Sequence, residues 1–211
     1  MKKVILIGDS IRIGYDKYVK AALAGKAEVF YPLKDNCRFA QYVLRSVSDW
    51  QKDEGWGNDA DLVHWNAGLW DTLRLYGDEP LTPPEMYGLM IKRIDKRLRY
   101  LFPNAKLVFA TSTRVLEEKY GPNFKRYNKD IDEYNKIAIE ALADTDEVIN
   151  DLGAFTKSLP DSFYSDMTHL YTPEGTKAMT NKVLEVICAE LGIDKVDYGS
   201  KEYHTDKPIG I

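Results

Sequence analysis

A serine near the amino end of the chain occupies a position that can support nucleophilic chemistry. Ser10 ends the run Gly8-Asp9-Ser10, which follows the apolar residues 4–7 and precedes a helical pattern that begins at Ile11. At the start of a helix, backbone N–H groups lack partners within the helix, and the helix dipole adds partial positive charge. Both can stabilise an oxyanion beside Ser10. A serine in this position is also a common helix N-cap, so Ser10 alone decides nothing.

An aspartate and a histidine near the other end of the chain could supply what the serine lacks. Asp166 and His169 lie three positions apart, just before the last expected helix. A serine hydroxyl is a weak nucleophile at neutral pH. It needs an imidazole to accept its proton and a carboxylate to orient that imidazole. Taken alone, the pair could be a surface turn or a helix cap. With Ser10 it predicts a triad in which Ser10 is the nucleophile, His169 the base and Asp166 the orienting acid.

The elements that must position these residues alternate between strands and helices. We expect helices over residues 11–23, 39–50, 84–101, 127–142 and 173–191, and strands over 4–7, 28–31, 62–65, 107–110 and 147–149. Strands that are apolar along their whole length are typical of a parallel sheet covered by helices on both faces, with right-handed crossovers. The expected fold is therefore α/β, a three-layer α/β/α sandwich with a five-stranded parallel sheet.

This fold predicts where a ligand binds. In open parallel sheets, ligands bind beyond the carboxyl ends of the strands, where the strand order reverses. The segments expected at that edge are 8–10, 34–40, 66–71, 111–114 and 151–170. Ser10 and the Asp166/His169 pair therefore fall at the same edge although their patterns are independent. This agreement favours the triad over the two structural interpretations.

The same residues resemble the SGNH hydrolase (GDSL-type esterase/lipase) family. Gly8-Asp9-Ser10 after the first strand and Asp166-x-x-His169 before the last helix match two of its blocks, and residues 66–71 resemble its third block, usually Gly-x-Asn-Asp. The resemblance extends from about Lys3 to Leu191 and is strongest to a bacterial branch. It implies a flavodoxin-like sheet, hydrolysis of carboxylic esters through an acyl-enzyme, and no cofactor or metal.

The sequence departs from the family's third block where the oxyanion hole is built. Gly68 and Asp71 match the glycine and aspartate of Gly-x-Asn-Asp, which leaves Trp70 in place of the asparagine. An indole N–H can donate a hydrogen bond, but its size favours a pocket wall. We therefore expect the Asn66 amide to be the side-chain donor. Asp9, Gly68, Trp70 and Thr111 are expected to lie around the substrate.

The second block departs as well. It usually supplies a glycine N–H, but residues 26–54 contain no glycine. Any residue except proline has a backbone donor, so we expect an N–H near Arg38 to replace it beside those of Ser10 and Asn66. The loss of one donor costs about 2.7–4 kcal/mol of transition-state stabilisation. These departures leave open a slow or specialised enzyme.

Composition and charge exclude several other classes. The chain has 211 residues, 44% of them hydrophobic, which suits one domain over residues 1–193 with a polar tail over 194–211. Its net charge of −4 disfavours a nucleic-acid partner.

Cys37 and Cys188 are expected to be free thiols. His64 is expected to be a structural strand histidine. No apolar run is long enough for a signal core or a membrane span, which favours a cytoplasmic location. A homo-oligomer stays open.

The sequence predicts the reaction better than the substrate. Short acyl chains, including acetyl groups on a carbohydrate, are the expected substrates by analogy with the bacterial branch. A lysophospholipase or thioesterase with a preference for longer chains is an alternative. So is a catalytically weak module that binds a glycan or acylated ligand in the same cleft, which Trp70 and the missing glycine suggest. A flavodoxin-like nucleotide or flavin binder is a third alternative.

Overall fold

Five parallel strands form the central sheet of the computed structural model, which describes residues 1–198. The sheet order is β2-β1-β3-β5-β7, and each pair of neighbours is parallel. The strands are β1 (Lys2–Ile7), β2 (Ala27–Phe30), β3 (Leu62–Trp65), β5 (Lys106–Ala110) and β7 (Val148–Asn150). The predicted five-stranded parallel sheet is therefore confirmed, with strand ends shifted by at most two residues.

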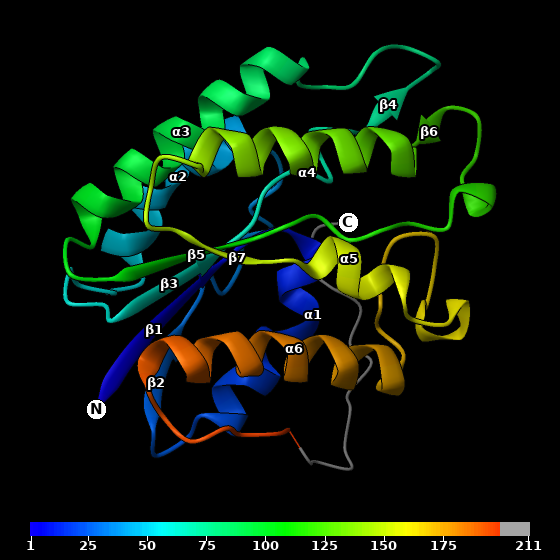
Figure 1. Ribbon diagram of the computed structural model, residues 1–211. Coiled ribbons are helices and arrows are strands. Elements are labelled where there is room, and N and C mark those ends of the chain that lie inside the picture. Colours follow the sequence, from blue (N-terminus) through cyan, green and yellow to red (C-terminus); the bar gives the residue numbers. More distant parts are fainter. Residues whose placement is uncertain (199–211) are drawn as a thin grey trace.

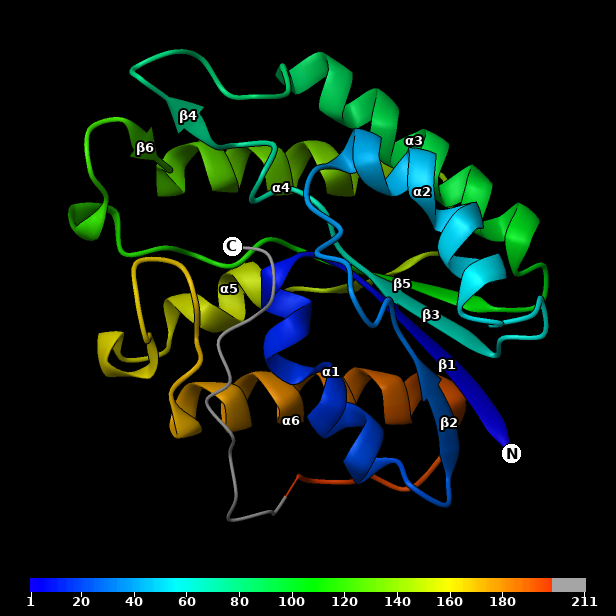
Figure 2. The ribbon, with the colours of Figure 1, turned by 180° about the vertical axis from the view of Figure 1, so that it is seen from behind.

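Helices cover both faces of this sheet (Figure 1). One face carries α2 (Ala40–Asp53), α3 (Pro84–Leu101) and α4 (Asn128–Leu142), and the other carries α1 (Ser10–Ala22) and α6 (Pro173–Leu191). Figure 2 shows the same two layers from behind, with α1 lying beside α6. The chain is thus the expected three-layer α/β/α sandwich.

The alternation of side chains along β1 explains why both cores are apolar. Val4 and Leu6 belong to the core under α1 and α6, whereas Ile5 and Ile7 belong to the core under α2, α3 and α4. Successive strand residues point to opposite faces, so a strand covered on both sides must be apolar throughout. The four side chains are fully buried.

Several short elements were not predicted. A two-stranded antiparallel sheet joins β4 (Arg74–Leu75) to β6 (Phe124–Lys125), and helix α5 (Leu152–Lys157) follows β7. Single 3-10 turns lie at Glu117–Lys119 and Asp161–Phe163. Strands of two residues and a helix of six are too short to show a hydrophobic period, so the sequence gives no signal for them.

The predicted tail begins on the domain surface. Residues 194–198 follow α6, and the Tyr198 N–H donates to Asn181 Oδ1 at 2.8 Å. The rest of the predicted tail lies outside the described residues. None of the helices in residues 1–198 has the length and apolar character needed to cross a membrane.

Candidate active site

Ser10 lies at the point where the strand order of the sheet reverses. The chain moves from β1 to β2 on one side and then returns to β3 on the other side of β1. Ser10 is the first residue of α1, directly after β1, and Asn66 follows β3. Asp9 is the N-cap of α1, and its Oδ1 accepts a hydrogen bond from the Ile11 N–H at 3.0 Å. Ser10 is therefore free from the capping role, and its hydroxyl is available to another partner.

That partner is the histidine from the far end of the chain. His169 Nε2 lies 2.8 Å from Ser10 Oγ, and His169 Nδ1 lies 2.7 Å from Asp166 Oδ2. Ser10 and His169 are separated by 159 positions in the sequence, and both side chains are buried. The structure thus brings together all three predicted triad residues, in the order that a serine nucleophile requires.

The loop that carries Asp166 holds this carboxylate in its ionised form. Asp166 Oδ1 accepts hydrogen bonds from the N–H groups of Thr168 at 2.7 Å and His169 at 2.8 Å. Partial burial raises the pKa of Asp166, but the hydrogen bonds from the His169 ring and from these N–H groups outweigh it and lower the pKa to about 2. An ionised Asp166 fixes the proton of the imidazole on Nδ1, which leaves Nε2 as an acceptor for the serine proton.

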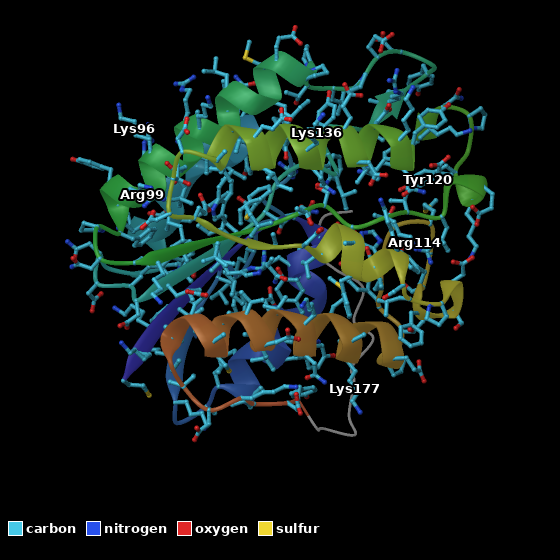
Figure 3. The ribbon with its side chains drawn as sticks, in the orientation of Figure 1. Lys96, Arg99, Arg114, Tyr120, Lys136 and Lys177 are labelled. Atoms are coloured by element: carbon cyan, nitrogen blue, oxygen red, sulfur yellow. The ribbon has the colours of Figure 1, made fainter. Side chains whose placement is uncertain are left out.

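Contacts from the segment after β5 position the same loop. Tyr120 Oη lies 2.5 Å from Thr168 Oγ1, and the Leu116 N–H donates to the Met167 carbonyl at 2.8 Å. Arg114 donates to the Leu159 carbonyl at 2.9 Å, just after α5. Arg114 and Tyr120 lie on the same side of the molecule as the loops between α5 and α6 (Figure 3). The histidine loop is therefore anchored at several points before any ligand binds.

Tyr171 is a site residue that the sequence analysis missed. Its ring stacks on the His169 ring with centroids 4.7 Å apart, and its hydroxyl donates to the Ser10 carbonyl. Tyr171 thus connects the two catalytic elements behind the Ser10–His169 hydrogen bond. Its position two residues after the histidine, at the same sheet edge, was the available signal.

The Asn66 side chain lies beside the end of β1, with its Oδ1 facing Gly8. Asn66 is buried, and a Cβ on Gly8 would overlap its side chain. Among the described residues, Asn66 Oδ1 has no hydrogen-bond partner. The absence of a side chain at Gly8 therefore lets the carboxamide approach the backbone next to Ser10.

The second predicted donor is occupied. Arg38 adopts a φ of 43°, in the left-handed region that favours glycine, so the backbone has the shape expected of the missing glycine. However, the Arg38 N–H donates to Asn36 Oδ1 at 3.2 Å, and the Cys37 N–H donates to the Gly8 carbonyl at 3.3 Å. This corrects the expectation that the Arg38 N–H is available to an oxyanion, because it would first have to leave Asn36.

A buried arginine braces this loop against α1. Arg12 lies two residues after Ser10 on α1 and is 1% exposed. Its guanidinium forms an ion pair with Asp16 and donates to the carbonyls of Gly8 at 3.2 Å, Pro32 at 3.3 Å and Asp35 at 2.6 Å. One side chain therefore connects the strand before the nucleophile with the loop that leads to Arg38.

Asp71 joins the third block to the second. Both of its carboxylate oxygens accept from the Ala40 N–H, at 3.2 and 3.1 Å, and Oδ1 also accepts from the Thr82 hydroxyl at 2.7 Å. Burial raises the pKa of Asp71 to about 7. The matching aspartate of the resemblance thus caps the first turn of α2.

Three of the four predicted pocket residues are buried and have structural roles. Asp9 is fully buried as the N-cap of α1. Gly68 has a φ of 148°, and a Cβ there would overlap the Ser112 hydroxyl. Thr111 Oγ1 donates to Asp151 at 2.8 Å and accepts from the Gly153 N–H at 2.8 Å. Of the four, Trp70 alone is partly exposed.

The other residues that the sequence analysis singled out, a histidine and two cysteines, are buried in the fold. His64 is fully buried in β3 with Nε2 3.1 Å from the Asn150 amide, and burial lowers its pKa to about 4. Cys37 and Cys188 are free and buried, as predicted. Within residues 1–198, no group of three or more His, Cys, Asp and Glu side chains could hold a metal ion.

Comparison with solved structures places this fold among ester hydrolases. A lipase/acylhydrolase from Enterococcus faecalis superposes with a TM-score of 0.70 at 17% identity, over 92% of this chain and 98% of that one. The acetyl xylan esterase AlAXEase gives 0.67 at 18% identity, over 88% and 99%. TesA gives 0.63 at 15% identity, over 90% and 99%. The chain has the fold of these hydrolases.

The similarity to these proteins is found by comparing structures and not by searching with the sequence. No protein-family model matches the chain, and no curated protein matches it in sequence. At identities below 20%, a shared fold says nothing by itself about a shared reaction. The function must therefore be argued from the site.

Proposed function

We propose that the chain is a serine esterase of the SGNH hydrolase type. The observation that carries this proposal is the continuous hydrogen-bonded series Ser10–His169–Asp166, with distances of 2.8 and 2.7 Å, at the sheet edge where the strand order reverses. The shared fold with lipase, acylhydrolase and acetyl xylan esterase structures supports ester hydrolysis as the reaction.

The reaction would proceed in two acyl transfers. His169 Nε2 accepts the hydroxyl proton as Ser10 Oγ attacks the ester carbonyl carbon, and Asp166 stabilises the imidazolium that forms. The tetrahedral intermediate collapses, its C–O bond to the alcohol breaks, and the alcohol leaves with the proton from His169. Water then attacks the acyl-enzyme with His169 again as base, which releases the acid and restores Ser10.

The proposed donors to the oxyanion are the Ser10 N–H and the Asn66 amide. The Ser10 N–H lies at the first turn of α1, and the Asn66 amide lies beside Gly8. Their contribution follows from their fixed position, because preorganised donors cost little reorganisation when charge develops. The third donor would come from the loop around Arg38 if the ligand displaces the contact with Asn36.

We propose short acyl esters, including acetyl groups on carbohydrates, as the substrates. One of the structures with this fold is described as an acetyl xylan esterase, which supports the choice. A series of 4-nitrophenyl esters from acetate to decanoate tests it. The highest kcat/KM is expected at two to four carbons, and a maximum at eight or more would favour the lysophospholipase or thioesterase alternative.

The triad itself is tested by replacing the nucleophile. Ser10→Ala should lower the kcat for 4-nitrophenyl acetate by roughly 10⁴-fold or more, because triad members act as a unit. Ser158→Ala is the matched control, since Ser158 lies on the surface after α5. Unchanged turnover in Ser10→Ala would exclude Ser10 from the mechanism.

A further inference from the structure

Arg126 is a buried cation next to the proposed catalytic site. It follows β6 and is 3% exposed. Among the described residues, no carboxylate lies within ion-pair distance of its guanidinium. Arginine is almost never fully buried unless it is paired. A buried charge without a counter-ion is costly, so its retention here calls for a ligand or a structural explanation.

The contacts of Arg126 satisfy only part of its guanidinium. Nε donates to the Leu69 carbonyl, and Nη1 donates to Tyr120 Oη at 3.2 Å. The guanidinium also lies 5.6 Å from the centre of the Trp70 ring and 5.4 Å from that of Phe124. Within residues 1–198, Nη2 donates to no protein acceptor. These contacts hold and orient the group without neutralising its charge.

The same contacts place Arg126 between two loops of the proposed active site. Leu69 and Trp70 belong to the third block, which follows Asn66 at the end of β3. Tyr120 leads to the histidine loop, because its hydroxyl lies 2.5 Å from Thr168 Oγ1. Burial raises the pKa of Asp9, next to Ser10, and the charges of Arg126 and His169 both oppose that rise. The charge of Arg126 therefore acts on the carboxyl group that precedes Ser10 in the chain.

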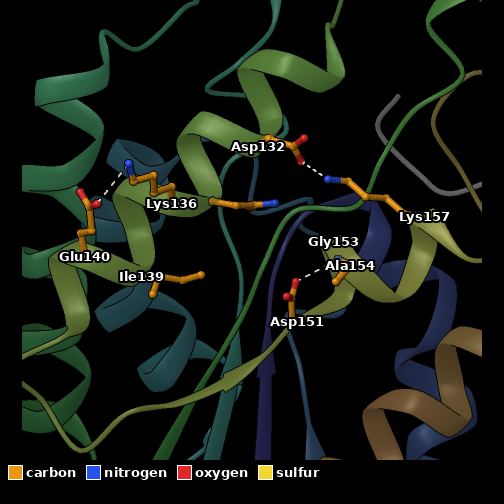
Figure 4. A pocket seen from close by; sticks show the side chains of 9 residues that line it. Asp132, Lys136, Ile139, Glu140, Asp151, Gly153, Ala154 and Lys157 are labelled. Atoms are coloured by element: carbon orange, nitrogen blue, oxygen red, sulfur yellow. Dashed lines mark hydrogen bonds and ion pairs between the residues drawn. The ribbon is translucent and has the colours of Figure 1, made fainter.

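The other buried arginine of residues 1–198 and the lysines that line a surface cavity do have carboxylate partners. A cavity of about 460 Å³ between α4 and α5 is lined by lysines and acids that pair with one another (Figure 4). There Lys157 lies 2.6 Å from Asp132, and Lys136 lies 3.7 Å from Glu140. Likewise, the buried Arg12 has its carboxylate partner in Asp16. The missing counter-ion is thus a feature of Arg126 and not of buried or clustered cations in general.

We propose that Arg126 binds a carboxylate of the substrate, so that the enzyme prefers esters that carry a negative charge close to the scissile bond. A carboxylate can accept two hydrogen bonds from a guanidinium, and Trp70 and Phe124 flank the group that would receive it. The inference rests on the proposed esterase function and names its substrate class. Arg126 would be a specificity-determining residue, outside the triad.

Two pairs of esters test the proposal and show whether the substrate carboxylate lies on the acyl side or on the alcohol side of the ester. In the first pair the charge is on the acyl side: the mono-4-nitrophenyl ester of glutaric acid against 4-nitrophenyl valerate. In the second it is on the alcohol side: acetylated methyl galacturonide against acetylated methyl galactoside. In at least one pair, the kcat/KM of the wild-type enzyme should favour the anionic ester by about 10-fold or more, mainly through KM.

Substitution of the arginine should remove that preference. Arg126→Met keeps the apolar stem but not the charge, and we expect its anionic-to-neutral ratio of kcat/KM to fall at least about 10-fold. Arg126→Lys should retain part of the ratio. Arg45→Met is the matched control, because Arg45 is an exposed arginine on α2 and its loss changes the net charge equally. A merely structural role would lower kcat/KM for both esters of a pair alike, and this result would overturn the proposal.

A measurement on the wild-type chain covers the case in which Arg126→Met does not fold. Glutarate should slow the labelling of Ser10 by a fluorophosphonate, whereas neutral glutaramide at the same concentration should not. Equal protection by both, or by neither, contradicts a carboxylate site. Since labelling itself reports the nucleophile, absence of labelling defeats the esterase proposal, while labelling without selective protection defeats only the role of Arg126.

Discussion

At the scale of single residues, the site depends on how a hydroxyl and an imidazole from opposite ends of the chain are kept in contact. Ser10 is held by the first turn of α1, and His169 by the two N–H groups that bind Asp166. Tyr171 joins the two sides through its ring and its hydroxyl. The hydrogen bonds of the proposed triad are therefore formed without substrate, which is the preorganisation that such catalysis would use.

Tyr171 allows the two parts of this connection to be separated. Tyr171→Phe keeps the ring that stacks on His169 and removes the hydrogen bond to the Ser10 carbonyl. A neutral hydrogen bond contributes about 1 kcal/mol, so we expect kcat to fall by roughly 10-fold or less. Tyr171→Ala, which also removes the stacking ring, should cost more.

Steady-state hydrolysis of 4-nitrophenyl acetate measures both variants. Tyr100→Phe serves as the control, because Tyr100 is 82% exposed on α3. A Tyr171→Phe enzyme as inactive as Ser10→Ala would contradict a positioning role and would place the hydroxyl in the chemistry itself.

At the scale of elements, the segments that follow the five strands of the central sheet meet at one edge, and buried polar side chains fix their relative positions. Arg12 links α1 to the loop after β2, and Asp71 links the loop after β3 to the start of α2. Thr111 links β5 to the start of α5. These links explain how a loop without glycine keeps the backbone shape seen at Arg38.

The link made by Arg12 should dominate the stability of this edge. Arg12→Met leaves the Asp16 carboxylate buried without its partner, and breaking a buried ion pair in this way costs about 3–5 kcal/mol. We expect the free energy of unfolding in urea to fall by that amount. The matched control is Arg45→Met, since Arg45 and Asp49 form an ion pair of the same helical spacing whose side chains are 72% and 54% exposed.

Exposed pairs of this kind contribute about 0–1 kcal/mol, so the control should remain near wild type. If both variants lose the same stability, Arg12 is not the brace that its contacts indicate.

The sequence predicted the regular elements and the triad, but not the links between loops. Strands such as β1 are recognisable because burial on both faces demands an unbroken apolar run, and the edge that carries Ser10 and His169 follows from parallel topology. The occupied Arg38 N–H, in contrast, depends on the Asn36 side chain and on a positive φ. Tyr171 and Arg126 depend on contacts across more than fifty positions. No local pattern encodes such contacts.

At the scale of the whole molecule, a partly buried acidic group precedes the last strand of the sheet. Glu147 precedes β7 and accepts a hydrogen bond from the Trp65 indole. Burial raises the pKa of Glu147, and the nearby Asp95 carboxylate adds to the rise. Because the folded pKa exceeds that of the unfolded chain, Glu147 contributes stability that is present below its unfolded pKa and lost as pH rises through the folded value.

Glu147→Gln should therefore change how stability depends on pH. The variant retains an acceptor for Trp65 and has no proton to lose, so its free energy of unfolding should decline less than that of the wild type between pH 5.5 and 8.5. The slopes of the unfolding free energy against pH should differ between the two proteins by at most about 1.4 kcal/mol per pH unit. Urea unfolding at three pH values measures it, with Glu118→Gln as the exposed control. Parallel profiles for wild type and Glu147→Gln would show that Glu147 ionises normally.

If Ser10 is a nucleophile activated by His169, it should react covalently with a fluorophosphonate. Incubation of the intact chain with this reagent, followed by peptide mass spectrometry, measures that reaction. We expect one adduct per chain, on the peptide that contains Ser10, and labelling slowed by several orders of magnitude in His169→Ala. A folded wild-type protein that remains unlabelled at Ser10, or a His169→Ala variant labelled as fast as wild type, would contradict it.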